Sequence, residues 1–133
     1  IANKKNIDLK LETQEKIPLV FADLSLVERA IQNLMDNALK FTPEGGSITL
    51  SVEPSAKTVS IKVSDTGPGI EEVDQAFIFE RYQQTKKDHK RQGVGLGLAI
   101  VKKILELHNT SIKLVSVPNV GSSFEFNLAT YSA

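Results

Sequence analysis

The sequence predicts an α/β two-layer sandwich of the α+β type. We expect a mixed, mainly antiparallel sheet of about five strands, with about three helices on one face. Segments of alternating apolar and polar residues, typical of strands, are interspersed with two longer segments whose apolar residues recur at helical spacing. The chain has 133 residues, 41% hydrophobic and 24% charged, which suits one domain with its own core. We therefore expect residues 1–133 to form a single domain.

The predicted strands are short segments of alternating character. Residues 47–53 and 58–65 alternate strictly, and the PSAK between them predicts a hairpin. The other predicted strands are residues 7–12, 111–117 and 122–129, together with a buried strand end at 18–23.

Two segments are predicted helices. Residues 25–41 carry an apolar stripe at helical spacing, and Ser25 and Glu28 have the spacing of a capping box at its start. Residues 95–108 form the second helix, and Asn109 follows it where a left-handed cap residue is expected.

Composition excludes several classes of function. Lys plus Arg equals Asp plus Glu at 16 each, so no global charge points to nucleic acid, and we expect no nucleic-acid partner. The absence of Cys excludes disulfides and thiolate chemistry and fits a reducing compartment. No apolar run is long enough to span a bilayer, and no secretory signal opens the chain. Since the first residue is Ile1 rather than Met, we expect a fragment of a longer protein. We also expect this domain to be cytoplasmic.

Asn33, Asn37 and Lys40 follow one face of the first predicted helix. Taken alone, they favour a solvated polar face of an amphipathic helix. Asn is a mediocre residue inside helices, so two on one face suggest a second reason. An amide oxygen suits Mg²⁺, and a nearby ammonium suits phosphate.

The stretch SDTGPGI (64–70) follows a predicted strand, and taken alone it is best explained as a turn. In the functional alternative, Asp65 is a hydrogen-bond acceptor at a pocket rim. Bare backbone at Gly67 and Gly69 would then let a flat ring approach closely.

The stretch GVGLGL (93–98) opens the second predicted helix. It lacks the Lys and hydroxyl that end a P-loop, and its spacing differs from the dinucleotide fingerprint. Gly93, Gly95 and Gly97 could present free N–H groups to phosphate at a helix N-terminus, although alone they also fit a flexible hinge.

In combination, these motifs resemble the catalytic, ATP-binding domain of two-component sensor histidine kinases. That domain belongs to a superfamily shared with DNA gyrase, mismatch-repair ATPases and heat-shock chaperones. NLMDNALKF resembles the N box, SDTGPGI the first glycine box, IFERYQQ the F box and GVGLGLAIVKKILELHN the second glycine box. The closing VGSSFEFNLA resembles the final strand pair, so the resemblance covers essentially the whole chain.

The resemblance implies a role for each matching position, with ATP and Mg²⁺ as cofactors. Asn37 would bind Mg²⁺, and Lys40 would contact phosphate. Phe41 would lie against adenine, and Asp65 would accept the proton of its amino group. The remaining nucleotide-binding positions would be Gly67, Gly69, Ile70, Gly93, Gly95, Leu96, Gly97, Leu98 and Ser122.

Residues 71–94 would form the ATP lid, with a short helix near 74–83. Phe77 and Phe79 fit either an apolar anchor of the lid or the core. Two departures from the family pattern fall here: Gln stands at positions 83 and 84, where an Arg is common, and Val94 replaces a Thr or Ser. The cations that could supply the missing charge are Lys86, Lys87, Lys90 and Arg91.

The ATPases and serine kinases of the superfamily resemble one another in one position, where they carry Glu. In this sequence that position is Asn33. An amide cannot act as a base for water or serine, whereas imidazole already offers a lone pair at neutral pH. Asn33 and Lys40 are therefore the expected catalytic residues of a kinase that phosphorylates histidine. Neither His89 nor His108 precedes an acidic residue, so neither matches the family's acceptor motif.

The implied function is transfer of the γ-phosphoryl group of ATP to a histidine on an adjacent dimerisation domain of the same protein. The alternatives are a nucleotide-binding regulatory module without transfer activity, and an ATPase of the superfamily. The implied partners are that dimerisation domain and a response regulator receiver domain, in a homodimeric parent protein. The sequence leaves open the stimulus, the cognate regulator and whether the parent is anchored in a membrane.

Overall fold

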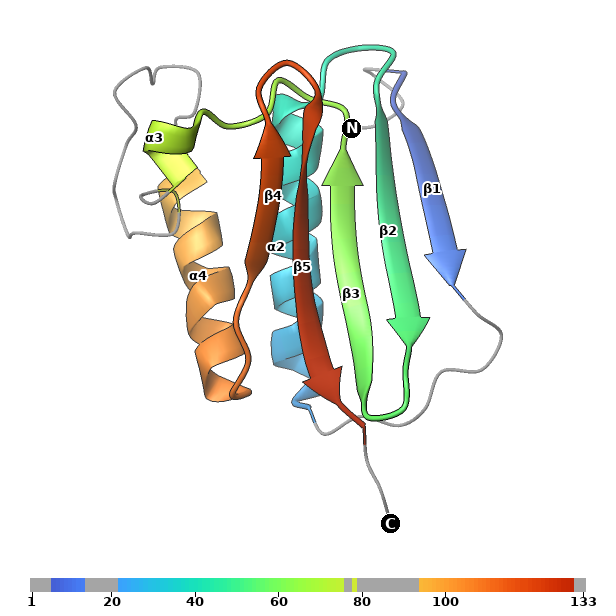
Figure 1. Cartoon of the computed structure of the whole chain (residues 1–133), viewed down its shortest axis with the longest axis vertical. Helices are drawn as coiled ribbons and strands as arrows, with labels where there is room; N and C mark the ends of the chain where they lie inside the picture. The colour runs from blue at the N-terminus through green and yellow to red at the C-terminus, as the bar shows by residue number, and fades with distance from the viewer. Residues whose placement is uncertain (1–5, 14–21, 76–77, 79–93, 131–133) are drawn as a thin grey trace.

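The computed structural model describes residues 6–13, 22–75, 78 and 94–130, with side chains from residue 97 onward in the last range (Figure 1). Its strands are β1 (Asp8–Thr13), β2 (Ser47–Pro54), β3 (Thr58–Asp65), β4 (Lys113–Val117) and β5 (Gly121–Ala129). Its helices are α2 (Leu24–Phe41), α3 (Glu72–Gln75) and α4 (Val94–Leu107). Among the described helices, none is both long and apolar enough to cross a membrane.

The five strands form one mixed sheet in the order β1-β2-β3-β5-β4. Strand β1 is parallel to β2, and every other neighbouring pair is antiparallel. The predicted hairpin is the β2–β3 pair, closed by a hydrogen bond from the Ser55 N–H to the Thr58 carbonyl at 2.8 Å. The fold class predicted from the sequence is confirmed.

Helices α2 and α4 pack together and cover one face of the sheet (Figure 1). Along α2, residues three or four apart share the buried face, as helical periodicity requires. The largest fully buried side chains are Phe124, Phe126, Leu34, Ile48, Leu98 and Leu105.

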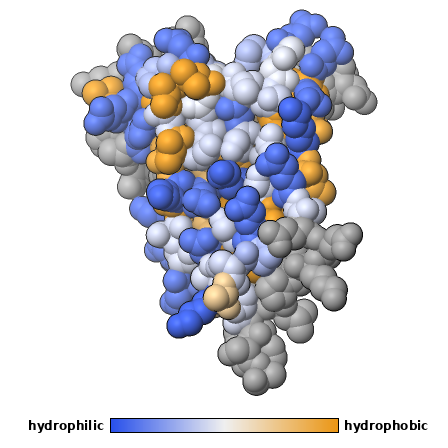
Figure 2. Space-filling view, turned by 45° about the vertical axis from the view of Figure 1, so that its right-hand side comes forward, coloured by the Kyte–Doolittle hydropathy of each residue, from blue (hydrophilic) through white to orange (hydrophobic). Residues whose placement is uncertain are grey.

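The other face of the sheet is open and carries polar side chains. Ser60 Oγ donates to Glu125 Oε2 at 2.6 Å, and Ser64 Oγ lies 3.0 Å from Ser123 Oγ. Hydrophilic side chains cover much of the face seen in Figure 2. The alternation that predicted the strands therefore separates a core face from a solvated face.

The start of α2 corrects one prediction. The N-cap is Asp23, whose Oδ1 accepts the Leu26 N–H at 3.1 Å, so the capping box predicted at Ser25 is wrong. Ser25 already lies within the first turn, and the Asp23 carboxylate is favoured by the positive end of the helix dipole. Ala22 and Asp23 precede the helix and do not belong to a strand. The strand predicted at 18–23 is therefore also wrong at these two residues.

At the same end of the helix pair, α4 stops as predicted. Asn109 has φ 56°, the left-handed conformation expected of it. The Thr110 N–H reaches back to the Leu105 carbonyl at 3.0 Å. His108 Nε2 accepts the Asp23 N–H at 2.9 Å, which ties the end of α4 to the start of α2.

Candidate functional site

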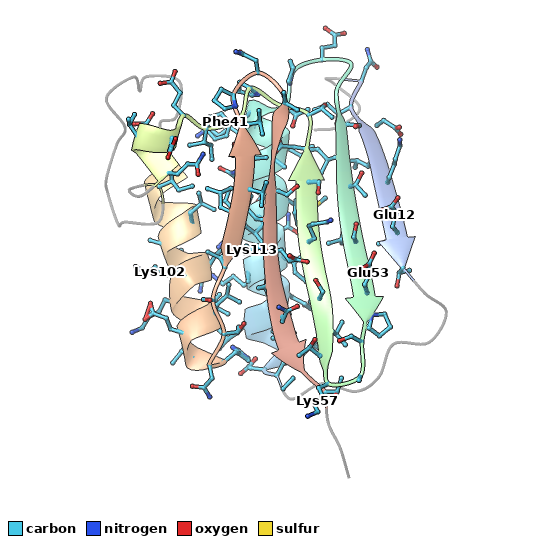
Figure 3. All side chains as sticks on the ribbon, viewed as in Figure 1. Glu12, Phe41, Glu53, Lys57, Lys102 and Lys113 are labelled. Atoms are coloured by element: carbon cyan, nitrogen blue, oxygen red, sulfur yellow. The ribbon has the colours of Figure 1, made fainter. Side chains whose placement is uncertain are left out.

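Four segments converge at one end of the molecule (Figure 1). Strand β3 ends there at Asp65, α2 ends at Phe41, and α4 begins at Val94. The loop of residues 66–70 follows β3 at this end. Phe41 lies at the end of the molecule opposite Lys57, which occupies the β2–β3 turn (Figure 3). The elements carrying three of the predicted motifs therefore meet at one place.

The polar face of α2 is only partly covered. Asn33 and Asn37 are half-buried and Lys40 is exposed, with its Nζ 5.8 Å from the centroid of the Phe41 ring. The Asn33 Nδ2 atom is buried and has no hydrogen-bond partner among the described residues. Buried donors are nearly always paired in proteins, so this amide is available to a partner from outside the described residues.

Asp65 organises the loop that follows it. Its Oδ1 accepts the Gly67 N–H at 2.8 Å, and Thr66 Oγ1 accepts the Ser47 N–H at 2.9 Å. A Cβ on Gly67 would lie 3.0 Å from Asp65 Oδ1 and 3.2 Å from the Phe41 carbonyl oxygen. Bare backbone at Gly67 therefore lets the loop approach the end of α2, and this approach brings Asp65 and Phe41 together.

Gly69 packs closely against another segment of the same chain. Its φ is 71°, and a Cβ there would overlap the Val117 carbonyl oxygen. Packing against the turn between β4 and β5 therefore already requires glycine. The prediction that Gly67 and Gly69 admit a nucleotide base stays a prediction.

The first turn of α4 contains Gly95, Leu96 and Gly97. A Cβ on Gly97 would meet no atom of the described residues within 4 Å. The first N–H groups of a helix have no partner within the helix, and they favour anions. Leu98 is 1% exposed and packs into the core, so its side chain anchors the turn.

Ser122 and Ile70 are buried beside Asp65. Ser122 on β5 pairs with Asp65 on β3, and its Oγ lies 2.8 Å from Ser116 Oγ. The Ile70 side chain is 2% exposed, and its N–H donates to Ser116 Oγ at 2.7 Å. Sequence reasoning missed Ser116, although it is a polar residue on the inward-facing side of an alternating strand.

Several predicted features lie outside the described residues. These are Gly93, most of the predicted lid, His89 and the positions discussed around the missing arginine. Within the predicted lid, α3 spans Glu72–Gln75, two residues before the predicted start, and Ile78 is buried.

The side-chain oxygen atoms at this site suit an Mg²⁺ ion that is coordinated mainly by the phosphates of a bound substrate and by water. Among the described residues, no group of three or more His, Cys, Asp or Glu side chains could hold a metal ion. Mg²⁺ commonly keeps waters and substrate phosphates and takes only one or two protein oxygens. A half-buried amide such as Asn37 fits that requirement.

Comparison with known proteins gives the family. Residues 22–132 match the model of the "Histidine kinase-, DNA gyrase B-, and HSP90-like ATPase" family. The adaptive-response sensory kinase SasA of Rippkaea orientalis is 41% identical over 129 residues, covering 96% of this chain and 33% of that protein. The chain thus spans about a third of the length of this curated relative.

Solved structures agree with this match. The catalytic domain of the histidine kinase ThkA superposes with a TM-score of 0.83 at 32% identity, covering 97% of this chain and 84% of that one. ThkA in complex with the response regulator TrrA gives a TM-score of 0.79 at 30% identity, covering 98% of this chain and 36% of that one.

Proposed function

The chain belongs to the family of histidine kinase-, DNA gyrase B- and HSP90-like ATPases, among the histidine kinase catalytic domains, and we propose which of its residues act on ATP. The site lies where α2 ends and α4 begins. It binds Mg-ATP and donates the γ-phosphoryl group to a histidine of a neighbouring domain. The observation that carries the proposal is the convergence of Asp65, Phe41 and the glycine-bearing first turn of α4 at one end of the fold.

Asp65 and Phe41 recognise the base. The Asp65 carboxylate, fixed by the Gly67 N–H, accepts a hydrogen bond from the exocyclic amine of adenine, and the Phe41 ring lies against the base. Guanine carries an acceptor at the same position, so this arrangement selects adenine. Ser122, buried beside Asp65, completes the base-binding end.

The phosphates lie toward the first turn of α4. The N–H groups around Gly95 and Gly97 face the polyanion, and no described atom within 4 Å of a Cβ at Gly97 would block its approach. Lys40, exposed at the end of α2, neutralises phosphate charge. The Asn37 oxygen would hold Mg²⁺, which supplies charge neutralisation on the phosphates when bound.

The amide of Asn33 points to histidine as the acceptor. An amide is no base for water, and the buried Asn33 Nδ2 offers only a hydrogen-bond donor. His108 is a poor candidate for the acceptor, because both of its ring nitrogens already have partners. Nε2 accepts the Asp23 N–H, and Nδ1 lies 2.8 Å from the Ile104 carbonyl, at the opposite end of α4 from the site.

Neither His89 nor His108 precedes an acidic residue, as the acceptor histidine of the family does, so we place the acceptor in another part of the parent protein. We propose an adjacent dimerisation domain in a homodimer, and a response regulator receiver domain as the next acceptor. The support is that ThkA, a structural neighbour, was solved with the response regulator TrrA. The Gln residues at positions 83 and 84 favour one alternative, a nucleotide-binding regulatory module without transfer activity.

Calorimetry with ATP, with and without Mg²⁺, tests the nucleotide site. We expect Asn37→Ala to retain helix content, because Ala is a strong helix former, and to lose most of the Mg²⁺-dependent gain in affinity. An equal Mg²⁺ effect in both proteins would show that Asn37 is only a polar residue at the rim.

Mixing with a separately made histidine-bearing domain of the parent tests the transfer. Alone with Mg-ATP, the chain should hydrolyse nucleotide very slowly and gain no acid-labile phosphate. With the second domain, acid-labile phosphate should appear on that domain's histidine. Binding without transfer would favour the regulatory module, and rapid ATP turnover by the isolated chain would favour an ATPase.

A further inference from the structure

A row of three polar side chains crosses the sheet at the proposed base-binding end. Asp65 on β3 pairs with Ser122 on β5, and Ser122 pairs with Ser116 on β4. Ile48 on β2 pairs with Asp65 and is fully buried, so the row faces the helix layer. The row therefore points into the molecule, where polar groups need partners.

The Ser116 hydroxyl joins three separate segments. Its Oγ accepts the Ile70 N–H at 2.7 Å, lies 2.8 Å from Ser122 Oγ and lies 3.3 Å from the Gly121 carbonyl oxygen. A hydroxyl has one proton and two lone pairs, so acceptance from Ile70 leaves Ser116 one proton to donate. If that proton goes to the Gly121 carbonyl, the second lone pair of Ser116 accepts from Ser122; if it goes to Ser122, the proton of Ser122 is left for another acceptor.

The turn between β4 and β5 also holds the loop of residues 66–70 through its backbone. The Asn119 N–H donates to the Pro68 carbonyl at 2.6 Å. A Cβ on Gly69 would overlap the Val117 carbonyl, and one on Gly121 would overlap the Asp65 carbonyl. The loop that follows Asp65 is thus shaped by a hairpin more than forty residues away in sequence.

We propose that Ser116 is a positioning residue for base recognition. By holding the Ile70 N–H and the Ser122 hydroxyl together, it fixes the loop so that Asp65 and Ser122 face the adenine edge. This inference rests on the proposed function, because it assumes that the base binds at Asp65. Ser116 acts through its neighbours and need not touch the nucleotide.

The test compares ATP with ITP, whose base carries an oxygen in place of the exocyclic amine of adenine. Dissociation constants in the presence of Mg²⁺ are measured at a temperature where each variant is folded. For Ser116→Ala we expect ATP binding to weaken roughly tenfold and the preference for ATP over ITP to shrink several-fold, because a buried donor loses its acceptor. Ser116→Thr, which keeps the hydroxyl, should restore both.

Ser123→Ala is the matched control. Ser123 lies on β5 but faces the open side of the sheet, where its Oγ contacts Ser64 Oγ. Its removal should leave both dissociation constants unchanged. Equal weakening of ATP and ITP in Ser116→Ala, or no weakening of either, would overturn the inference. If Ser116→Ala does not fold, Ser116→Cys gives the same comparison, since a thiol has similar size but accepts poorly.

Amide hydrogen exchange at Ile70 separates this inference from the proposed function. Exchange at Ile70 should be at least roughly tenfold faster in Ser116→Ala than in the wild type, and unchanged in Ser123→Ala. A wild-type protein that binds ATP and ITP equally would refute the adenine site itself. Unchanged exchange at Ile70 in a protein that does prefer ATP would refute only the role of Ser116.

Discussion

The two ends of the helix layer differ in how completely their polar groups are paired. Where α2 begins and α4 ends, the Asp23 carboxylate caps one helix, and Asn109 and Thr110 close the other. His108 joins the two through the Asp23 N–H. Such an end stabilises the fold and leaves little for a ligand to satisfy.

The end where α2 stops and α4 begins is built differently. Thr42, the C-cap of α2, is fully buried, and its Oγ1 has no partner in the described part of the chain. The Nδ2 atom of Asn33, midway along α2, is also buried and has no hydrogen-bond partner in the described part of the chain. The first turn of α4 contains two glycines, Gly95 and Gly97. Unpaired polar atoms and bare backbone are poor for stability, and they suit a site completed by a polar ligand.

Gly69→Ala should strongly destabilise this end of the fold. The substitution places a methyl on the Val117 carbonyl and forces a non-glycine residue to φ 71°. We expect a loss of roughly 3 kcal/mol in the free energy of unfolding, measured by urea denaturation.

Gly45→Ala separates the two causes. Gly45 has φ 84° but open space around its Cβ position, so only the backbone conformation is penalised. We expect about 1 kcal/mol there. Equal losses at the two positions would mean that the contact with Val117 is unimportant.

Asp65→Asn should weaken binding at the proposed base site and leave the fold intact. The Asn oxygen can still accept the Gly67 N–H, while an NH₂ donor replaces the second carboxylate oxygen. Losing a charged hydrogen bond costs about 1.5–3 kcal/mol, so ATP should bind roughly tenfold more weakly or worse. Calorimetry measures the affinity for ATP, and thermal denaturation measures the stability of the fold. Equal affinity of the wild type for ATP and GTP would contradict the assignment of Asp65.

His108→Ala should affect only the paired end. The change removes the acceptor of the Asp23 N–H, which is near solvent, so we expect a loss of about 1 kcal/mol in unfolding free energy. ATP affinity of the folded protein should stay within about twofold of wild type, because the site lies at the other end of α4. A parallel loss of stability and affinity would show that the two ends are coupled.

Local patterns predicted most of the fold because helices and hairpins depend on nearby residues. The predicted strand 58–65 matches β3, and the predicted helix 25–41 differs from α2 by one residue. The cap was mispredicted because both Asp23 and Ser25 are good capping residues, and the path of the preceding chain decides between them. The parallel pairing of β1 with β2 is long-range and leaves no local signal.

The site was predicted only in part. Resemblance identified Asp65, Phe41 and the glycines of α4, and these segments do converge. Ser116 was missed because the role proposed for it depends on partners at positions 70 and 122, which only the folded chain brings together. The reason predicted for a glycine at position 69 was likewise incomplete. The Val117 carbonyl, which excludes a side chain there, lies far along the sequence.

Gly97→Ala gives the smallest expected change in stability and the clearest separation of stability from function. Ala is favoured over Gly in a helix by up to about 1 kcal/mol, and a Cβ at Gly97 would meet no described atom within 4 Å. The melting temperature should therefore rise. If phosphate groups approach the bare backbone of this turn, ATP affinity should fall in the same variant. Ala99→Gly, two residues further along α4, is the matched reverse change and should lower stability without altering affinity. A gain in stability with unchanged ATP binding would mean that Gly97 serves as a hinge into α4 and that the phosphates are held elsewhere.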